Sequence, residues 1–77
     1  MNEDKTTDEM REFRKLIGTM IAEIRAEQGL DHAKLSEESG LSVGAIKGAE
    51  NGRFSVDADI LFKLKGVLRF DIVFETY

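Results

Sequence analysis

Few side chains in this chain are of types that could carry out catalysis or bind a metal ion. The 77 residues include one histidine, His32, and no cysteine. The lack of cysteine excludes disulfide bridges, thiolate zinc sites and cysteine nucleophiles. No pair of carboxylates stands in a fitting context, and the Gly44-x-x-x-Gly48 spacing is not that of a phosphate-binding P-loop. The sequence therefore predicts a protein that is not an enzyme and that needs neither a metal ion nor a cofactor.

The charged residues are distributed unevenly along the chain. The formal net charge is −4, which by itself disfavours nucleic acid, because phosphate binding favours a basic surface. The distribution of charge matters more than its total. Between His32 and Phe54 the cations Lys34, Lys47 and Arg53 balance three glutamates, whereas other acidic residues are concentrated near the two ends of the chain. The middle segment is thus locally neutral, and phosphate contacts there are not excluded.

A long helix is expected to come first among the elements that position these side chains. Apolar residues recur at steps of three and four over residues 8–28, the period of an amphipathic helix with one buried face. Thr7 or Asp8 would cap the start of this helix, and Gly29 would end it. Residues 1–7 are then expected to form a disordered tail.

Two short helices are expected next. Asp31 and Ser42 are good N-cap residues, and Gly40 separates the two helices, of which the second spans residues 43 to about 51. Two short helices joined by a glycine turn of this length define a helix-turn-helix. A fourth helix is expected to complete one domain that spans residues 8–68.

The segment of residues 29–52 resembles the helix-turn-helix of Cro and phage repressors, the family named after the xenobiotic response element. The similarity covers about residues 17–68, most of the chain. Its strongest elements are the Gly40-Leu-Ser turn, Ile46 in the third helix and the terminal Glu50-Asn-Gly, whose joint spacing is far more specific than any one of them. The resemblance implies an all-α, lambda-repressor-like bundle of four to five helices. It also implies a transcription regulator that binds duplex DNA.

The resemblance further implies roles for individual residues. In this family an arginine late in the first helix pairs with the glutamate that ends the recognition helix, and Arg25 and Glu50 occupy those places. A structural ion pair between them is expected. Positions that contact DNA phosphates in the family are matched by His32, Lys34, Ser42, Asn51 and Arg53. For His32, an exposed position at a helix start without any role is an equal alternative.

By the family's pattern the third helix enters the major groove of DNA. The helical wheel turns Ala45, Ile46 and Ala49 inward, and four residues are left to face the groove: Val43, Gly44, Lys47 and Gly48. Only Lys47 has a polar head, which could reach guanine O6 and N7 or a phosphate, whereas Val43 could touch a thymine methyl group. Three explanations of the two glycines stay open: close approach to DNA, close packing against a partner helix, and loss of sequence reading with the fold retained.

Residues 69–77 are expected to form a C-terminal dimerisation arm. Its large apolar residues stand at every second position, the period of a β-strand with one buried face: Phe70, Ile72 and Phe74. Because a lone strand is not stable in water, the simplest partner is the same strand of a second copy. Such a homodimer would bury these residues and place two recognition helices in successive grooves of one duplex. A short fifth helix that completes the core is the alternative.

A second hypothesis for the function is a protein-interaction module. The segment of residues 60–68 looks like the antitoxin branch of the family, in which a strand follows this helix. Acidic ends and apolar groove-facing residues would suit a surface that grips a toxin or another protein, with weak or secondary binding to DNA. The N-terminus lacks the apolar core of a secretion signal and no run approaches membrane-spanning length. A cytoplasmic protein without a membrane partner is therefore expected.

Overall fold

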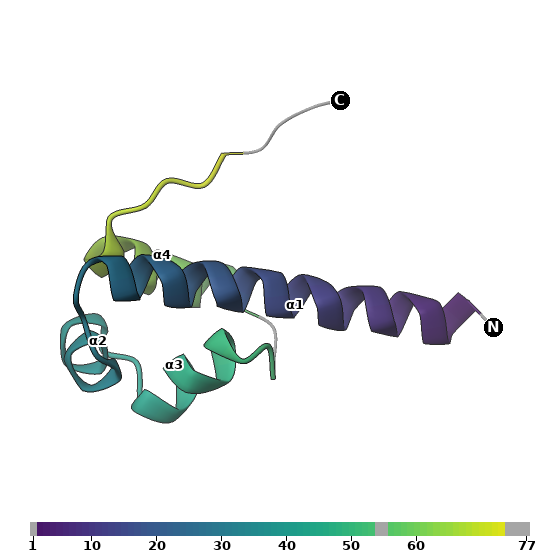
Figure 1. Cartoon of the computed structure of the whole chain (residues 1–77), viewed down its shortest axis with the longest axis horizontal. Helices are drawn as coiled ribbons and strands as arrows, with labels where there is room; N and C mark the ends of the chain where they lie inside the picture. Colours follow the sequence, from purple (N-terminus) through teal and green to yellow (C-terminus); the bar gives the residue numbers. More distant parts are fainter. Residues whose placement is uncertain (1, 54–55, 74–77) are drawn as a thin grey trace.

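The computed structural model describes residues 2–53 and 56–73, with the backbone alone for residues 2–6. Within these residues the chain forms four helices and no strand: α1 (Asn2–Glu27), α2 (His32–Ser39), α3 (Val43–Glu50) and α4 (Ala58–Leu68). Figure 1 shows α2 and α3 on one side of the long α1, α4 behind it, and the chain after α4 leaving on the other side. The described chain is an all-α helix-turn-helix bundle, as the sequence predicts.

The first helix begins earlier than the sequence analysis expects. It starts at Asn2, so that residues 2–7 are helical where a disordered tail was expected, and Thr7 and Asp8 lie inside the helix. The physical reason is that apolar periodicity marks only the part of a helix that packs against something. No glycine or proline stands before Gly18, and extending an existing helix costs far less than starting one.

Side-chain caps and a glycine turn set the path between α2 and α3. Asp31 Oδ1 accepts a hydrogen bond from the backbone N–H of Lys34 at 2.7 Å, and Ser42 Oγ accepts one from that of Ala45 at 3.0 Å. Between the two helices Gly40 has a φ of 80°, a conformation that residues with a Cβ rarely adopt. The turn predicted from these residue types is thus present, and it fixes where α3 begins.

Each of the four helices gives at least one side chain to a single core. Its members are almost fully buried: Ile21 of α1, Leu35 of α2, Ile46 of α3, and Leu64 and Leu68 of α4. Burying one such side chain contributes about 1.5–3 kcal/mol to folding. Because one small cluster joins all four helices, the position of α3 depends on the same contacts that hold α1 and α4 together.

The C-terminal arm does not form the expected strand in its described part, residues 69–73. Arg69 ends α4 in a left-handed conformation with a φ of 56°, and the chain turns there toward the side of the bundle opposite α3. Phe70 packs half-buried against the core cluster, whereas Ile72 and Val73 are exposed. Phe74 lies outside the described residues. A strand needs a second strand to bond with, and the chain offers no other candidate.

The two backbones of α1 and α3 come very close at Gly18. A Cβ on Gly18 would meet the carbonyl oxygens of Ala49 and Glu50, and it would lie 2.5 Å from that of Glu50. At the same crossing, a Cβ on Gly52 would lie 2.9 Å from Cγ of Lys15. Real Cβ atoms essentially never come within 3.0 Å of another heavy atom. The end of α3 can therefore rest on α1 only because both positions lack side chains.

Replacing Gly18 by alanine should destabilise the fold, although alanine favours a helix by about 1 kcal/mol over glycine. The added methyl group overlaps with backbone oxygens of α3, and such overpacking costs roughly 1–3 kcal/mol. We expect the free energy of unfolding, measured by urea denaturation and circular dichroism, to fall by about 2 kcal/mol.

Gly66 of α4 provides the matched control for this substitution. A Cβ on Gly66 meets nothing within 4 Å, so Gly66→Ala should raise the free energy of unfolding by about 0.5–1 kcal/mol. Equal stabilisation by the two substitutions would contradict the close crossing of α1 and α3.

Candidate nucleic-acid interface

The outer side of α3 presents residues from its first turns. Ile46 and Ala49 are buried, with 1% of each exposed, and this fixes which side of the short helix faces the core. Gly44 and Lys47 are exposed on the other side, and Val43 beside them is partly exposed. Three of the four residues expected to face a groove are thus accessible from outside.

Gly48 is the exception among the four, because it is buried. The backbone N–H of Arg53 donates to Gly48 O at 2.9 Å, so the chain that leaves α3 folds back against its last turn. A helical wheel considers only the residues of the helix, so it cannot show that the chain after α3 folds back against its last turn. Gly48 therefore belongs to the packed end of α3 and not to its groove-facing side.

Gly44 has a different environment from Gly48. A Cβ placed on Gly44 would meet none of the described chain within 4 Å. Packing inside this chain therefore does not account for a glycine in the first turn of α3, where it costs the helix about 1 kcal/mol relative to alanine. Two kinds of explanation for Gly44 are left. Either an outside molecule, DNA or a partner helix, comes close to this backbone, or α3 has lost the ability to read a DNA sequence.

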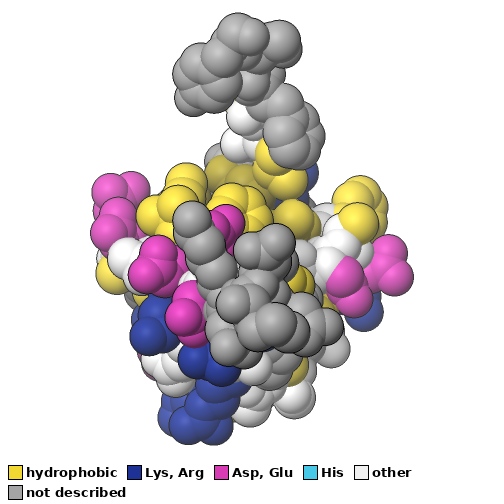
Figure 2. All heavy atoms as spheres, turned by 90° about the vertical axis from the view of Figure 1, so that its right-hand side faces the viewer, with side chains coloured by type: hydrophobic (Ala, Val, Ile, Leu, Met, Phe, Trp, Pro, Cys, Tyr) yellow, Lys and Arg dark blue, Asp and Glu magenta, His cyan; other side chains and the backbone are white. Residues whose placement is uncertain are grey.

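The residues expected to contact phosphates surround α3. Ser42 stands at its N-cap with its hydroxyl bonded to the N–H of Ala45, and Asn51 is the exposed residue at its C-terminal end. Lys34 in the first turn of α2 and Arg53 after α3 are also exposed. Figure 2 shows Lys and Arg side chains gathered on the side where α3 lies, and hydrophobic side chains on the opposite side.

His32 lies in a different place from the other four phosphate candidates. Its Nε2 is 2.9 Å from Oε1 of Glu50, and its side chain is 30% exposed. Sequence analysis did not find this contact, because two residues on different helices share no periodicity. The loop before α2 brings them together: Arg25 Nη1 donates to Leu30 O at 2.8 Å, so the chain wraps around Arg25 just before His32.

Arg25 and Glu50 form a two-pronged ion pair between α1 and the end of α3. Arg25 Nε donates to Glu50 Oε2 at 2.6 Å, and Nη2 donates to Oε1 at 3.1 Å. Only 8% of the Glu50 side chain is exposed. With His32, the pair links α1, α2 and α3 at one carboxylate, in the geometry in which charge-assisted hydrogen bonds are strongest. These partners also neutralise an anion that would otherwise repel a phosphate near α3.

The two partners keep Glu50 ionised. Burial alone would raise the pKa of its carboxyl group, but the hydrogen bonds from Arg25 and His32 and the charges of both partners outweigh burial, so the pKa lies below its ordinary value. The hydrogen bond to Glu50 in turn raises the pKa of Arg25. Because the folded pKa of Glu50 is lowered, its contribution to stability is present above the unfolded pKa and is lost as pH falls through the folded pKa.

Replacing Glu50 by glutamine should destabilise the fold by about 2 kcal/mol at neutral pH, because it leaves Arg25 without its anion. The difference in unfolding free energy from the wild type should shrink as the pH falls below the ordinary glutamate value of 4.5. Urea denaturation over a pH series measures both effects. Glu38→Gln, on the exposed side of α2, should leave stability within about 0.5 kcal/mol of the wild type. A deficit of Glu50→Gln that does not change with pH would argue against the ionised pair.

Among the described residues, no three metal-ligating side chains come together in a way that could hold a metal ion. In the same part of the chain, no helix has both the length and the apolar character needed to cross a membrane.

A family model described as helix-turn-helix matches residues 21–74, which run from the second half of α1 through α4 into the arm. No curated protein and no solved structure matches the chain. The matched region holds the whole core, the Gly40 turn and α3. The chain belongs to the helix-turn-helix family of Cro and phage-repressor type, whose members are DNA-binding regulators.

Proposed function

We propose that this chain is a homodimeric transcription regulator that binds duplex DNA through the outer side of α3, with a dependence on sequence. The observation that supports this most directly is the exposure of Gly44 and Lys47 on a helix whose other side is locked to the core. Lys and Arg side chains gather on the same side of the molecule (Figure 2). A helix in this position fits the major groove of B-form DNA.

Direct reading of bases would depend mainly on one side chain. Lys47 is the exposed polar residue in the middle of α3, and its ammonium group could donate to guanine O6 and N7 or to a phosphate. Val43 could contact a thymine methyl group, and Gly44 offers bare backbone to which DNA could come close. Because so few side chains can contact base edges, the shape and deformability of the duplex should determine much of the sequence specificity.

Contacts to phosphates would place α3 in the groove. Lys34, Ser42, Asn51 and Arg53 are exposed around it, at the two ends of α3 and at the start of α2. His32 is tied to Glu50, so we propose that it positions the ends of α2 and α3 and that any phosphate contact is secondary. Such contacts fix the register of a protein on DNA without reading its sequence.

The homodimer would involve the C-terminal arm. Ile72 is 46% exposed, and among the described residues no backbone hydrogen bond is made by residues 70–73. Pairing of two arms as β-strands would satisfy these groups and cover Ile72, and it would extend to Phe74, which lies outside the described residues. The small core also favours a partner, because a domain of this size is marginally stable alone.

Gly44→Ala should separate stability from DNA binding. The free energy of unfolding should rise by about 0.5–1 kcal/mol, because the new methyl group meets nothing in the chain. Affinity for duplex DNA, measured by fluorescence anisotropy at fixed salt, should fall at least about tenfold if the backbone of α3 touches the duplex. Gly66→Ala is the control, expected to gain stability and to bind DNA like the wild type. Unchanged affinity of Gly44→Ala would exclude close approach at this glycine.

Two further substitutions should change DNA binding in different ways. Lys47→Ala should relax the preferred site in a selection of bound fragments from random DNA, because it removes the polar reader. Arg53→Ala should weaken binding to all duplexes alike and lower the slope of log affinity against log salt by about one. Lys65→Ala is a control, since Lys65 pairs with Asp71 on the arm side. Wild-type binding that does not weaken as salt rises would refute the proposed function.

A further inference from the structure

The single histidine of the chain, His32, lies beside the helix that is proposed to meet DNA. It is the first residue of α2, and its ring contacts Glu50 at the C-terminal end of α3. Histidine is the side chain that ordinarily changes its charge between about pH 5 and 8. A change of charge at His32 would therefore take place at the edge of the proposed interface.

The two ring nitrogens of His32 have different surroundings, and Nε2 faces the protein. Nε2 lies 2.9 Å from Oε1 of Glu50. Although burial opposes it, the hydrogen bonds and charges of Arg25 and His32 keep the pKa of Glu50 below its ordinary value, so this group is a carboxylate. A carboxylate can only accept hydrogen bonds, so Nε2 carries a proton and donates it. In a neutral imidazole the other nitrogen, Nδ1, then has a lone pair and no proton.

The second nitrogen, Nδ1, is open to solvent. Among the described residues Nδ1 has no hydrogen-bond partner, and no buried side-chain nitrogen or oxygen lacks one. Nδ1 must then be accessible from outside, in agreement with the 30% exposure of the His32 side chain. Two exposed candidates for phosphate contacts are near in the chain, because Lys34 follows His32 by two residues and Asn51 directly follows Glu50. Nδ1 is therefore available to a phosphate at this edge of α3.

The protonation state of Nδ1 decides whether a phosphate is accepted there. Neutral His32 presents a lone pair, which repels phosphate oxygens because they are acceptors as well. Protonated His32 can donate from both nitrogens at once, through Nε2 to Glu50 and through Nδ1 to the phosphate. Hydrogen bonds between ionised partners are roughly twice as strong as neutral ones. Contact with a phosphate would thus favour the protonated form.

The charges around His32 are balanced while its imidazole is neutral. The carboxylate of Glu50 is already matched by the guanidinium group of Arg25 from α1. Asp31 and Lys34, on either side of His32 in the chain, add one charge of each sign. Among the described residues, no other charged residue of α1, α3 or α4 forms an ion pair with these groups. A proton on His32 leaves the group with a net positive charge, which a phosphate of bound DNA would neutralise.

We propose that DNA binding by this chain is coupled to the uptake of a proton by Nδ1 of His32, so that affinity for DNA rises as pH falls from 8 to 6. The inference rests on the proposed function and adds to it a regulation by pH. Because the bound state holds the proton more tightly than the free state, binding is strengthened on the acid side and weakened as pH rises. The positioning role of His32 belongs to Nε2, and the phosphate contact is added only when Nδ1 is protonated.

Calorimetry of the full chain with a duplex selected for binding measures this coupling. The duplex is synthetic and lacks terminal phosphate groups, which titrate in the same range. Titrations at pH 7 in two buffers of different ionisation enthalpy give the number of protons taken up. We expect roughly half a proton or more per bound chain, and an affinity roughly three- to tenfold higher at pH 6 than at pH 8. The slope of log affinity against log salt should also be steeper by about one at pH 6, because a further cation then meets a phosphate.

His32→Gln is the deciding variant, because glutamine can still donate to Glu50 but has no charge to change. The variant keeps every other group that could titrate in this range. It should bind the duplex without proton uptake, with equal salt slopes at the two pH values and with affinities that agree within about twofold. Urea denaturation at both pH values checks that it is folded. A role of His32 in stability alone would not change the salt slope.

Lys34→Gln is the matched control, two residues further along α2. It removes an exposed cation that does not change its charge between pH 6 and 8. This variant should weaken binding by the same factor at pH 6 and pH 8, and it should take up as many protons as the wild type. Loss of proton uptake in this control would show that the coupling does not depend on His32 in particular.

The outcomes separate this inference from the proposed function. Salt-sensitive binding by the wild type without proton uptake would refute the coupling and leave the proposed function standing. Equal proton uptake by the wild type and by His32→Gln would place the proton on another group. Proton uptake with equal salt slopes at pH 6 and pH 8 would refute the phosphate contact at Nδ1. A wild-type chain that binds no duplex at any pH or salt would refute the proposed function itself.

Discussion

The C-terminal end of α3 rests on the backbone of α1, and the surface that α3 presents depends on this contact. Gly18 and Gly52 allow the two backbones to meet, and the carboxylate of Glu50 is held beside them by Arg25 and His32. Steric contact limits how close the two helices come, and the contacts of Glu50 with Arg25 and His32 tie the C-terminal end of α3 to α1 and α2. Both contacts involve Glu50, whose backbone oxygen faces Gly18 and whose carboxylate faces Arg25 and His32.

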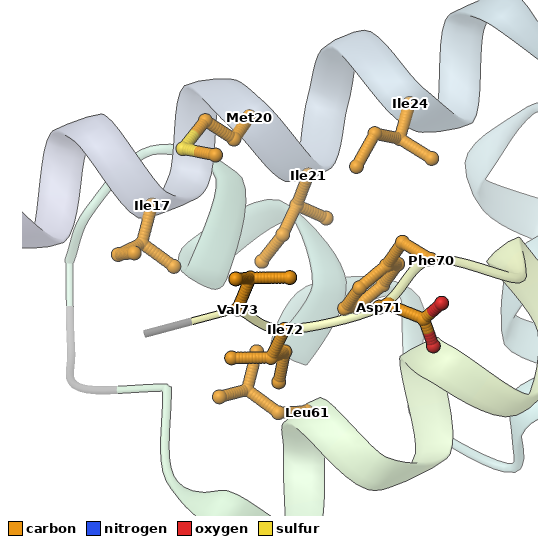
Figure 3. A pocket seen from close by; sticks show the side chains of 9 residues that line it. All are labelled: Ile17, Met20, Ile21, Ile24, Leu61, Phe70, Asp71, Ile72 and Val73. Atoms are coloured by element: carbon orange, nitrogen blue, oxygen red, sulfur yellow. The ribbon is translucent and has the colours of Figure 1, made fainter. Parts of the chain in front are cut away.

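This crossing divides the molecule into two sides with different chemistry. On one side, α3 exposes Gly44 and Lys47. On the other, α1 exposes Phe13, and an apolar groove lies between α1, Leu61 of α4 and residues 70–73 of the arm (Figure 3).

Local signals in the sequence were sufficient for the helix-turn-helix and for part of the candidate interface. Asp31, Ser42 and Gly40 act within a few residues of themselves, so their types predict caps and a turn directly. The features that sequence analysis missed depend on contacts between distant segments. The close approach at Gly18, the hydrogen bond between His32 and Glu50, and the burial of Gly48 produce no periodic pattern in the sequence. The strand expected in the arm needs a partner that one chain does not contain.

The central claim is that the outer side of α3 meets DNA, and backbone amide NMR of the labelled protein during titration with duplex DNA tests it most directly. The account predicts that the largest shifts, weakened by added salt, fall on residues 43–47 and on Asn51 and Arg53, while the amides of Phe13 and Leu16 shift little when protein and DNA are at equal concentration. Shifts concentrated on α1 and the arm, with those of α3 unchanged, would contradict it.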